Sequence, residues 1–384
     1  MGSALRDKAA IVGVGQTEFA KQLPGTEIEL ALRAITMALD DAGIPVTDVD
    51  GLASYTMEDT EEVDIARNLG TGPITWFGQV GYGGGAGCGV VGNAAMAVAS
   101  GQCDVAVAWR SRKRGGRASR PWAGVGSKVY GYQQWTRPFG LLRPVDEIAM
   151  LARRYMHEYG MTREQLACVA LTQRRFANNN PGAMMHEKAL TLDDYLAARW
   201  ISEPLCLFDN CLESDGAGAV VICSTDRAKD LDRQPVLVHA FAQSIPPQLQ
   251  TMTNYFCDDP LRGPSWECAE RLWRNADLGP EDVDVAQIYD AFSPLVPLSL
   301  EGYRFCGRGE GKDFISDGSI GPGGSLPVNT SGAGMSEAYV HGFNLIVEGV
   351  RQLRDESPNQ VDNARTCLVT SGEGVPTSAL LLRR

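Results

Sequence analysis

An internal repeat restricts the fold of this chain more than any other feature of its sequence. The segment CAERLWRNADLGPEDVDVAQIY aligns without a gap with the segment around ALRAITMALDDAGIPVTDVDGLA, so that Asp282–Asp284 overlays Asp48–Asp50. A looser second match pairs a predicted helix near 92–100 and the strand DVAVAW with a predicted helix near 342–353 and the strand TCLVTS. Chance can produce one short match, but two matches in the same order favour duplication.

The hydrophobic pattern within the repeats predicts alternating strands and helices. AAIVGVGQTEF is a short apolar run that ends in glycines, which is typical of a buried strand. We therefore predict an α/β fold of two duplicated βαβ halves, with helices on both faces of the buried strands. Apolar residues at three- and four-residue spacing predict the helix in ALRAITMALDDAG: Ala31, Ala34, Ile35, Ala38 and Leu39.

A less regular insertion separates the two halves. We expect an N-terminal half at 1–115 and 205–230, an inserted loop domain at 116–204, and a C-terminal half at 231–384. Helices are predicted within the insertion at 146–159 and 164–177, and insertions of this size often serve as lids or binding loops. Its aromatic residues either wall an apolar substrate pocket or pack in a core: Trp122, Tyr130, Tyr132, Trp135 and Phe139.

Composition excludes several classes of protein. A net charge of −12 argues against non-specific nucleic-acid binding. The chain has no apolar run of roughly 18 residues and no signal-peptide pattern, so we expect a cytoplasmic protein without a membrane partner. The ten cysteines lie in hydrophobic segments and indicate buried side chains, not a disulfide framework. The four histidines lack metal-ligand spacing, so no bound metal is expected.

Four motifs in order resemble those of the thiolase superfamily, most closely its sterol-carrier-protein branch. SDGAGAVV, QIYDAFSP, GSLPVNTSGAGMSEAYVHG and SGEGVPTSALLL are similar to the strings that this family carries in the same sequence order. The likeness spans nearly the whole chain. It implies a thiolase fold with five layers, α-β-α-β-α, a homodimer through the thiolase core, and coenzyme A as part of the substrate.

The thiolase cysteine nucleophile is missing at the matched position. In thiolases it stands at a helix start, where the dipole and backbone N–H groups lower its pKa. Here that position is Gly84, and the terminal glycine-rich turn at 371–374 contains no cysteine either. Cys88 lies one helical turn further along, where we expect its thiol to be packed. We also expect the missing side chain at Gly84 to leave room for a bulky ketone fragment.

Two tyrosines stand where the family carries catalytic residues. Tyr339 aligns with the histidine of the GHP motif, and Tyr289 with the first residue of NEAF or HDCF. The resemblance implies that both face the thioester pocket. One tyrosine alone is usually a half-buried aromatic, but two at catalytic positions favour function. His341 is either a packed histidine or a supporting residue, and Asp290 either supports Tyr289 or has no role in the site.

Two phenols without a nucleophile suit a retro-aldol cleavage. With a pKa of about 10, a tyrosine donates hydrogen bonds at neutral pH and accepts a proton only when its environment is tuned. Cleavage of a β-hydroxyacyl-CoA needs loss of the hydroxyl proton and protonation of the thioester enolate. Backbone N–H groups near Gly84 and Gly374 are expected to stabilise that enolate. No lysine for a Schiff base lies in the aligned motifs.

The paired tyrosines resemble those of the bacterial lipid-transfer-protein steroid aldolases. These cleave a 17-hydroxy steroid C20-carboxyl-CoA to a 17-ketosteroid and propionyl-CoA in steroid side-chain degradation. The resemblance implies a small partner with an OB-fold and a zinc ribbon, bound to the homodimer as a heterotetramer. Two other functions stay open: a non-catalytic acyl-CoA-binding subunit of a multi-protein complex, and an active thiolase that uses Cys88.

One basic cluster stands out in this acidic chain. Arg110, Arg112 and Arg114 continue to Arg117 and Arg120. Arginine forks suit phosphate, so the cluster either binds coenzyme A or contacts a second subunit or a partner. Asp215 in SDGAG is expected to shape a turn.

Overall fold

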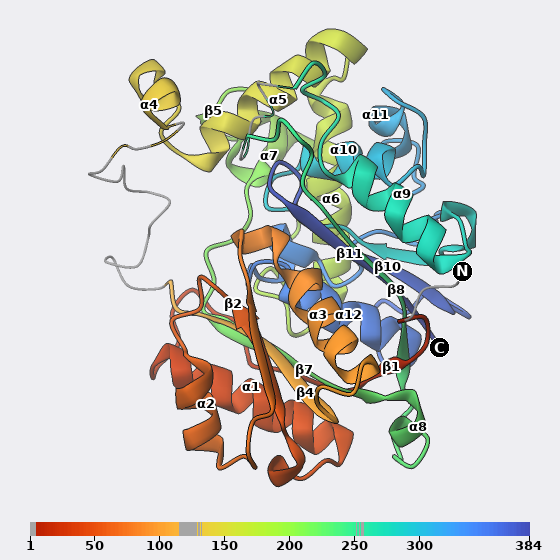
Figure 1. Ribbon diagram of the computed structural model, residues 1–384. Helices are drawn as coiled ribbons and strands as arrows, with labels where there is room; N and C mark the ends of the chain where they lie inside the picture. The colour runs from red at the N-terminus through yellow and green to blue at the C-terminus, as the bar shows by residue number, and fades with distance from the viewer. Residues whose placement is uncertain are drawn as a thin grey trace.

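A computed structural model describes residues 5–114, 129, 131, 133–250, 252, 254 and 257–384. Nine strands form one mixed sheet in the order β3-β2-β4-β7-β1-β8-β11-β10-β9 (Figure 1). The strands of the N-terminal half are β1 (Ala9–Gln16), β2 (Gly51–Tyr55), β3 (Trp76–Val80), β4 (Val105–Arg112) and β7 (Gly216–Ser224). Those of the C-terminal half are β8 (Val236–Ser244), β9 (Val285–Gln287), β10 (Thr366–Ser371) and β11 (Thr377–Arg383).

The helices complete five layers. The outer layer of the N-terminal half holds α1 (Glu27–Ala42) and α2 (Glu62–Leu69), and that of the C-terminal half holds α9 (Ser265–Ala276) and α10 (Leu295–Gly302). Between the strands of the two halves lie α3 (Gly87–Ala99) and α12 (Phe343–Leu353) (Figure 1). Because α3 packs against β2, β4 and β7 as well as β8, β10 and β11, it belongs to both halves. The predicted thiolase-type α/β arrangement is confirmed.

The duplication is visible in the strand pairing. In the N-terminal half β2 pairs with β4 in parallel, and β7 is antiparallel to both β4 and β1. In the C-terminal half β9 pairs with β10 in parallel, and β11 is antiparallel to both β10 and β8. The pairing of β1 with β8 then joins the two halves edge to edge.

The two aspartates of the sequence repeat make equivalent contacts. The Asp50 carboxylate accepts the backbone N–H groups of Asp104 and Val105, at the start of β4. The Asp284 carboxylate accepts those of Arg365 and Thr366, at the start of β10. A short acidic side chain thus ties two parallel strands together in each half, which explains why the DVD string is present twice.

The region between β4 and β7 carries four helices and a two-stranded hairpin in its described part. The helices predicted at 146–159 and 164–177 are present as α5 (Pro144–Tyr159) and α6 (Arg163–Asn179). The other elements between β4 and β7 are α4 (Gln133–Thr136), α7 (Leu192–Ala197), β5 (Trp200–Ser202) and β6 (Leu205–Cys206). The N-terminal half adds α8 (Thr225–Ala228), and the C-terminal half adds α11 (Gly311–Phe314). The three domain boundaries drawn from the sequence stay a prediction.

The aromatic residues of the insertion do not wall a pocket where the structure describes them. Trp135 and Phe139 are 75% and 83% exposed. Trp122, Tyr130 and Tyr132 lie outside the described residues, as do Arg117 and Arg120 of the basic cluster. Among the described helices, none has the length and apolar character needed to cross a bilayer.

Candidate active site

The two predicted tyrosines meet in the centre of the molecule. Tyr289 follows β9, and Tyr339 follows a π-helical turn (Ala333–Glu337) that leads into α12. Their hydroxyl groups share a hydrogen bond, and their ring centroids lie 6.1 Å apart. The side chains are almost enclosed, with 5% of Tyr289 and 7% of Tyr339 exposed. The sequence alignment therefore placed both phenols correctly with respect to each other.

Burial keeps both phenols protonated at neutral pH. It raises the pKa of Tyr289 well above its usual value, and the nearby Tyr339 raises it further. Burial also raises the pKa of Tyr339, while the Arg114 guanidinium acts in the opposite direction. A negative charge on one phenol disfavours a second charge on the other, so the pair loses one proton at most.

Gly84 is in direct contact with Tyr289. A Cβ added at Gly84 would lie 1.8 Å from the Tyr289 hydroxyl oxygen, and one added at Gly342 would lie 2.9 Å from Cδ2 of the same ring. The phenol therefore fills the space beside the position of the missing nucleophile. The expectation that this space receives a ketone fragment is wrong, because the Tyr289 side chain occupies it.

Asp290 holds the turn that leads to Tyr339. Its carboxyl group accepts the backbone N–H groups of Gly334 and Met335 at 2.9 and 3.1 Å. Burial raises the pKa of Asp290 to about 7 despite these two hydrogen bonds. Asp290 thus contacts the backbone of the π-helical turn rather than the phenol pair.

Cys88 has the opposite environment from that of a nucleophilic cysteine. Its thiol is fully buried and donates to the backbone carbonyl of Val369 at 3.3 Å. Burial raises the pKa of the Cys88 thiol to about 12. The prediction of a packed thiol is confirmed. Its position differs from the prediction, because Cys88 is the second residue of α3 and its N–H donates to Ser371 Oγ at 2.7 Å.

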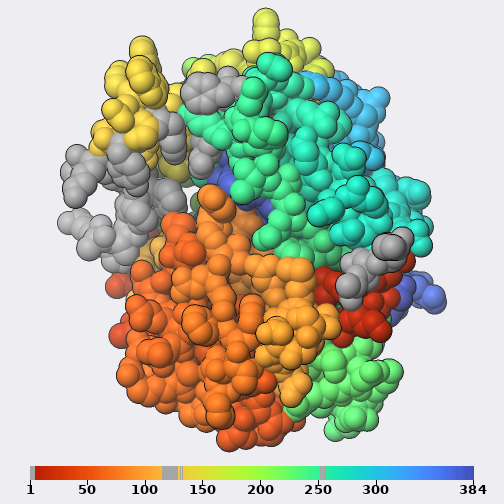
Figure 2. Space-filling model, viewed as in Figure 1, coloured from red at the N-terminus to blue at the C-terminus, as the bar shows by residue number. Residues whose placement is uncertain are grey.

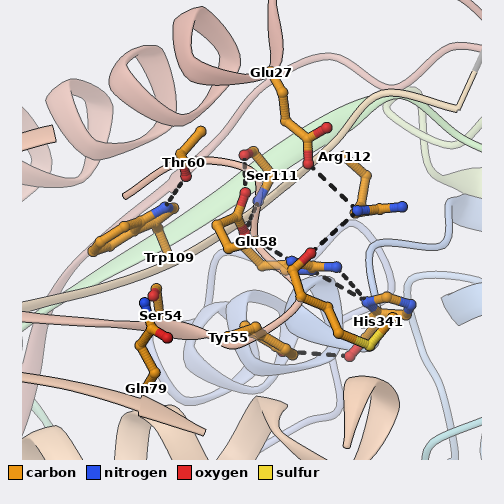
Figure 3. Close-up of polar contacts among 12 residues, drawn as sticks. Glu27, Ser54, Tyr55, Glu58, Thr60, Gln79, Trp109, Ser111, Arg112 and His341 are labelled. Atoms are coloured by element: carbon orange, nitrogen blue, oxygen red, sulfur yellow. Dashed lines mark hydrogen bonds and ion pairs between the residues drawn. The ribbon is translucent and has the colours of Figure 1, made fainter. Parts of the chain in front are cut away.

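The arginine cluster is turned inward. Arg110, Arg112 and Arg114 are each at most 8% exposed at the end of β4. Arg110 pairs with Glu58 at 3.0 Å, and Glu58 also accepts hydrogen bonds from Ser111 (Figure 3). These guanidinium groups point at protein groups, so the prediction that they contact coenzyme A phosphates does not fit their burial.

His341 lies between two of these arginines. Its Nδ1 is 2.8 Å from Arg110 Nη2, and its Nε2 is 2.9 Å from Arg114 Nη2. Its backbone φ is +53°, in the left-handed region that few histidines adopt. Burial and the three arginines hold the pKa of His341 well below its usual range, so the imidazole is neutral.

Comparisons with known proteins agree with this geometry. The C-terminal residues 255–382 match the family model described as "Thiolase C-terminal domain-like". The chain is 44% identical to the 17-hydroxy-3-oxo-4-pregnene-20-carboxyl-CoA lyase of Mycobacterium tuberculosis, over 98% of this chain and 100% of that protein. It is also 44% identical to a steroid side-chain-cleaving aldolase of Thermomonospora curvata, over 99% of each chain. The chain belongs to this aldolase family of the thiolase superfamily.

Solved structures place the family within the thiolase fold. The structure titled "Ltp2-ChsH2(DUF35) aldolase" superposes with a TM-score of 0.94 at 43% identity and covers 99% of both chains. Human mitochondrial 3-ketoacyl-CoA thiolase superposes with a TM-score of 0.71 at 15% identity over 99% of both chains, which shows a shared fold alone. This family member therefore has the fold of a thiolase.

The glycine-rich turn of this aldolase-family chain packs on the start of α3. The Pro376 carbonyl oxygen lies 1.8 Å from where a Cβ on Gly85 would stand. Gly374 has a φ of +81°, and among the described residues none accepts a hydrogen bond from its N–H. The turn thus contacts Gly85, the residue after Gly84, and the expected role of Gly84 and Gly374 in stabilising an enolate stays a prediction.

Two residues of the site were missed by the sequence analysis. Glu58 anchors Arg110, but it is one of several acidic residues in TMEDTEEVD, and nothing in that string distinguishes it. Tyr55 lies under the Arg110 guanidinium, whose Cζ is 4.7 Å from the ring centroid. The repeat contained a signal for Tyr55, because the gapless alignment pairs it with Tyr289.

Proposed function

We propose that this chain catalyses retro-aldol cleavage of a β-hydroxyacyl-CoA. The observation that carries the proposal is the hydrogen-bonded pair of Tyr289 and Tyr339 beside Gly84. The relatives named above act on steroid acyl-CoA esters, which supports a 17-hydroxy steroid C20-carboxyl-CoA as substrate. The products are a 17-ketosteroid and propionyl-CoA.

The phenol pair supplies both proton transfers. Because both phenols are protonated, the transfers are coupled: as the carbon–carbon bond breaks and the ketone forms, one phenol oxygen takes the proton of the substrate hydroxyl and passes its own proton to the other phenol. The bonding electrons pass into the thioester as an enolate, and the other phenol gives its proton to the enolate carbon. The hydrogen bond between the two hydroxyls lets the proton pass from one phenol to the other. No proton is gained or lost by the enzyme in a full cycle.

We propose that the reaction needs neither a metal nor a covalent cysteine intermediate. The thioester itself accepts the bonding electrons, and backbone N–H groups at Gly84 and Gly374 stabilise the enolate oxygen. The raised pKa of the buried Cys88 thiol supports this role for the thioester, because a thiol that stays protonated is a poor nucleophile.

We propose that a hollow at the surface, shown in Figure 2, is the entrance for the substrate. It shows a hollow between the N-terminal half, in orange, and the segment that follows β8, in green and teal. Residues of the C-terminal part of the chain, in blue, lie at the floor of this hollow. We propose that the acyl-CoA enters here, with the steroid and the thioester placed across the two halves.

We propose a homodimer that contacts its neighbour through β3. This strand ends the sheet, and its outer edge has no neighbouring strand among the described residues. Phe77 on β3 is 70% exposed and Met96 on α3 is 43% exposed, beside a shallow groove of about 360 Å³. The superposed aldolase structure is named for two components, Ltp2 and ChsH2(DUF35), which supports a second, smaller subunit. We propose that this subunit has an OB-fold with a zinc ribbon. We propose that the complete assembly is a cytoplasmic heterotetramer.

The test is product formation by the chain with and without a co-encoded small OB-fold protein. With 17-hydroxy steroid C20-carboxyl-CoA, mass spectrometry should detect ketosteroid and propionyl-CoA. Tyr289→Phe and Tyr339→Phe should each lower kcat/KM at least 100-fold, in the range of a lost general acid or base. Tyr303→Phe is the matched control, because Tyr303 is 1% exposed and packs in the outer core of the C-terminal half, away from the phenol pair. Binding of the ester without cleavage would favour the non-catalytic subunit instead.

A further inference from the structure

The backbone of each tyrosine in the phenol pair is held by a side chain from another segment. β9 ends at Gln287, and the N–H of Tyr289, two residues later, donates to Thr370 Oγ1 on β10 at 3.0 Å. The N–H of Tyr339 donates at 3.0 Å to Ser214 Oγ, two residues before β7 begins. Thr370 is 2% exposed, and Ser214 is fully buried. Each phenol is therefore carried by a residue whose N–H is accepted by a buried hydroxyl.

A third side chain fixes the residue before Tyr289. The Asn329 side chain accepts the N–H of Ile288 at 2.7 Å and donates to the Ile288 carbonyl at 2.9 Å. Asn329 is fully buried, and its backbone φ is +62°, in the left-handed region that asparagine adopts more readily than most residues. Asn329 and Thr370 thus hold two successive residues through side chains, just beyond the point where the backbone pairing of β9 with β10 ends.

The segment that carries Ser214 also joins the two turns that carry the phenols. The N–H of Cys211 donates to the Ala291 carbonyl in the loop after β9, at 3.0 Å. The N–H of Leu212 donates to the Gly334 carbonyl in the π-helical turn, at 2.9 Å. Residues 211–214 therefore fix the loop after β9 relative to the turn that precedes the second phenol.

A hydroxyl acceptor allows the backbone to turn toward the centre of the molecule without losing a hydrogen bond. A buried N–H without a partner costs about 1–3 kcal/mol, so each of these N–H groups stays close to its acceptor. The hydrogen bond between the two phenols requires a narrow range of distances and angles between their oxygen atoms. Thr370 belongs to the C-terminal half and Ser214 to the N-terminal half. Together they fix the separation of the two tyrosine backbones.

We propose that Thr370 and Ser214 are positioning residues, which hold the backbones of Tyr289 and Tyr339 so that the two phenol oxygens exchange a proton during cleavage. The inference rests on the proposed aldol cleavage and adds residues that act through the phenols. A displacement of about 1 Å in a reacting group lowers a rate by about 100-fold. Loss of either hydroxyl should therefore slow the proton transfers and leave binding of the ester nearly unchanged.

Two substitutions at position 370 separate the hydroxyl from the shape of the side chain. Thr370→Val keeps the branched shape and removes the acceptor, whereas Thr370→Ser keeps the hydroxyl and loses a methyl group. We expect Thr370→Val to lower kcat by about 10- to 100-fold with KM within about twofold. Thr370→Ser should keep kcat within about threefold of the parent. A side chain that serves only packing would give the opposite order, because the serine leaves the larger gap.

Ser214→Ala should act like Thr370→Val, because it removes the acceptor of the Tyr339 N–H. Thr136→Val and Ser299→Ala are the matched controls. Thr136 on α4 is 5% exposed and Ser299 on α10 is 2% exposed, so both hydroxyls are buried. Neither accepts the N–H of a tyrosine of the phenol pair, and both controls should keep the parental kcat.

A spectrum of the full chain without substrate gives the second measurement. 3-Fluorotyrosine takes the place of Tyr289 or Tyr339 by amber suppression, and its fluorine resonance is recorded by NMR. Thr370→Val should shift the resonance at 289 by more than its linewidth, whereas Thr370→Ser should leave it near the parental position. Ser214→Ala should shift the resonance at 339.

A folded Thr370→Val variant with the parental kcat, or with an unmoved resonance at 289, would overturn the inference. Equal losses of kcat in Thr370→Val and Thr370→Ser would also overturn it. If Thr370→Val does not fold, Ser214→Ala decides in the same way through kcat and the resonance at 339. If the parent chain cleaves no ester, the proposed function fails by itself, and the fluorine spectra still decide whether the hydroxyls position the phenols.

Discussion

The strands β2 and β9 are equivalent in the two halves, yet the tyrosines at or just after their ends have different neighbours. Tyr55 and Tyr289 each stand five residues after the aspartate that ties its strand to the next one. Tyr55 is fully buried, and its hydroxyl donates to the His341 carbonyl at 3.4 Å. The Tyr289 hydroxyl instead bonds the Tyr339 hydroxyl, and 5% of Tyr289 is exposed. The duplication accounts for the equivalent positions of the two tyrosines, and each hydroxyl contacts a residue of the C-terminal half.

The ends of β4 and β10 differ in charge. Arg114 stands two residues beyond β4, and Glu373 stands two residues beyond β10. Arg114 lies over the ring of Tyr339, whereas the Glu373 carboxyl accepts the N–H of Ser265 at the start of α9. The two halves therefore share a scaffold, and the candidate site forms where they differ. The N-terminal half contributes a bare helix start and a cation, and the C-terminal half contributes the phenols.

Gly84→Ala should disturb the contact between the N-terminal helix start and the phenols of the C-terminal half more than any other substitution. The added methyl would overlap the Tyr289 phenol, and the ring has no free space because it also packs on Gly342. We expect kcat/KM to fall at least 100-fold, since a displaced phenol loses its alignment with substrate. Overpacking should also lower the free energy of unfolding by about 1–3 kcal/mol. Steady-state kinetics and thermal unfolding measure the two effects.

Gly321→Ala is the matched control for Gly84→Ala. A Cβ at Gly321 would meet its nearest atom at 3.4 Å, an ordinary contact. Its activity and thermal stability should equal those of the parent chain. Near-parental activity in Gly84→Ala would mean that the contact of Gly84 with Tyr289 has no part in the reaction.

Much of this arrangement could be predicted because the relevant information is local in sequence. Asp50 and Asp284 lie in a repeat that aligns without a gap, so the sequence alone predicts that the two halves are equivalent. Tyr289 and Tyr339 lie in short motifs whose spacing is fixed by the strands and turns that carry them. The buried thiol of Cys88 followed from its place within an apolar helix start.

The rest depends on contacts between segments far apart in sequence. Gly84 lies in the N-terminal half and contacts Tyr289 of the C-terminal half. No local sequence motif indicates that these two residues are close. The inward orientation of Arg110 depends on its contacts with Glu58 and His341, and the three residues come from three separate segments. A basic run in an acidic protein looks like a surface patch until its partners are known.

Glu373→Gln tests whether the carboxyl group beyond β10 is protonated in the folded chain. Burial raises the pKa of Glu373 from 4.5 to about 8, so the folded chain holds a proton that the unfolded chain releases. Stability therefore falls as pH rises from about 4.5 to about 8, by about 1.4 kcal/mol per pH unit for this one group. The neutral glutamine removes that contribution. The stability of Glu373→Gln relative to the parent should rise across this interval and then level off.

Denaturant unfolding at several pH values measures the effect. Glu270→Gln serves as control, because Glu270 is exposed on α9 and its substitution should leave the pH dependence unchanged. A constant difference between Glu373→Gln and the parent from pH 5 to 9 would show that the carboxyl is already ionised when folded. Glu373 beyond β10 would then carry a negative charge, opposite to that of Arg114 beyond β4.

Asp50→Asn and Asp284→Asn test whether the two halves are energetically equivalent. Each carboxylate accepts two backbone N–H groups at the start of the next strand, and an amide turns one acceptor into a donor. We expect each variant to lose about 1–2 kcal/mol of unfolding free energy and to keep cleavage activity within about threefold. Denaturant unfolding should give similar losses. A loss confined to one variant would contradict the equivalence of the halves.

Cys88→Ala should have the smallest effect on activity, although Cys88 is four residues from Gly84, the position matched to the thiolase nucleophile. The thiol is fully buried, and its pKa is raised to about 12, so it contributes packing at the start of α3 and no thiolate. Activity should stay within about twofold, at a cost of about 1 kcal/mol in stability. Iodoacetamide should label Cys88 in the native chain more slowly than the partly exposed Cys257, as peptide mass spectrometry can measure. Rapid labelling of Cys88 with parallel loss of activity would assign the catalytic role to the Cys88 thiol, and the phenol pair would lose its proposed role.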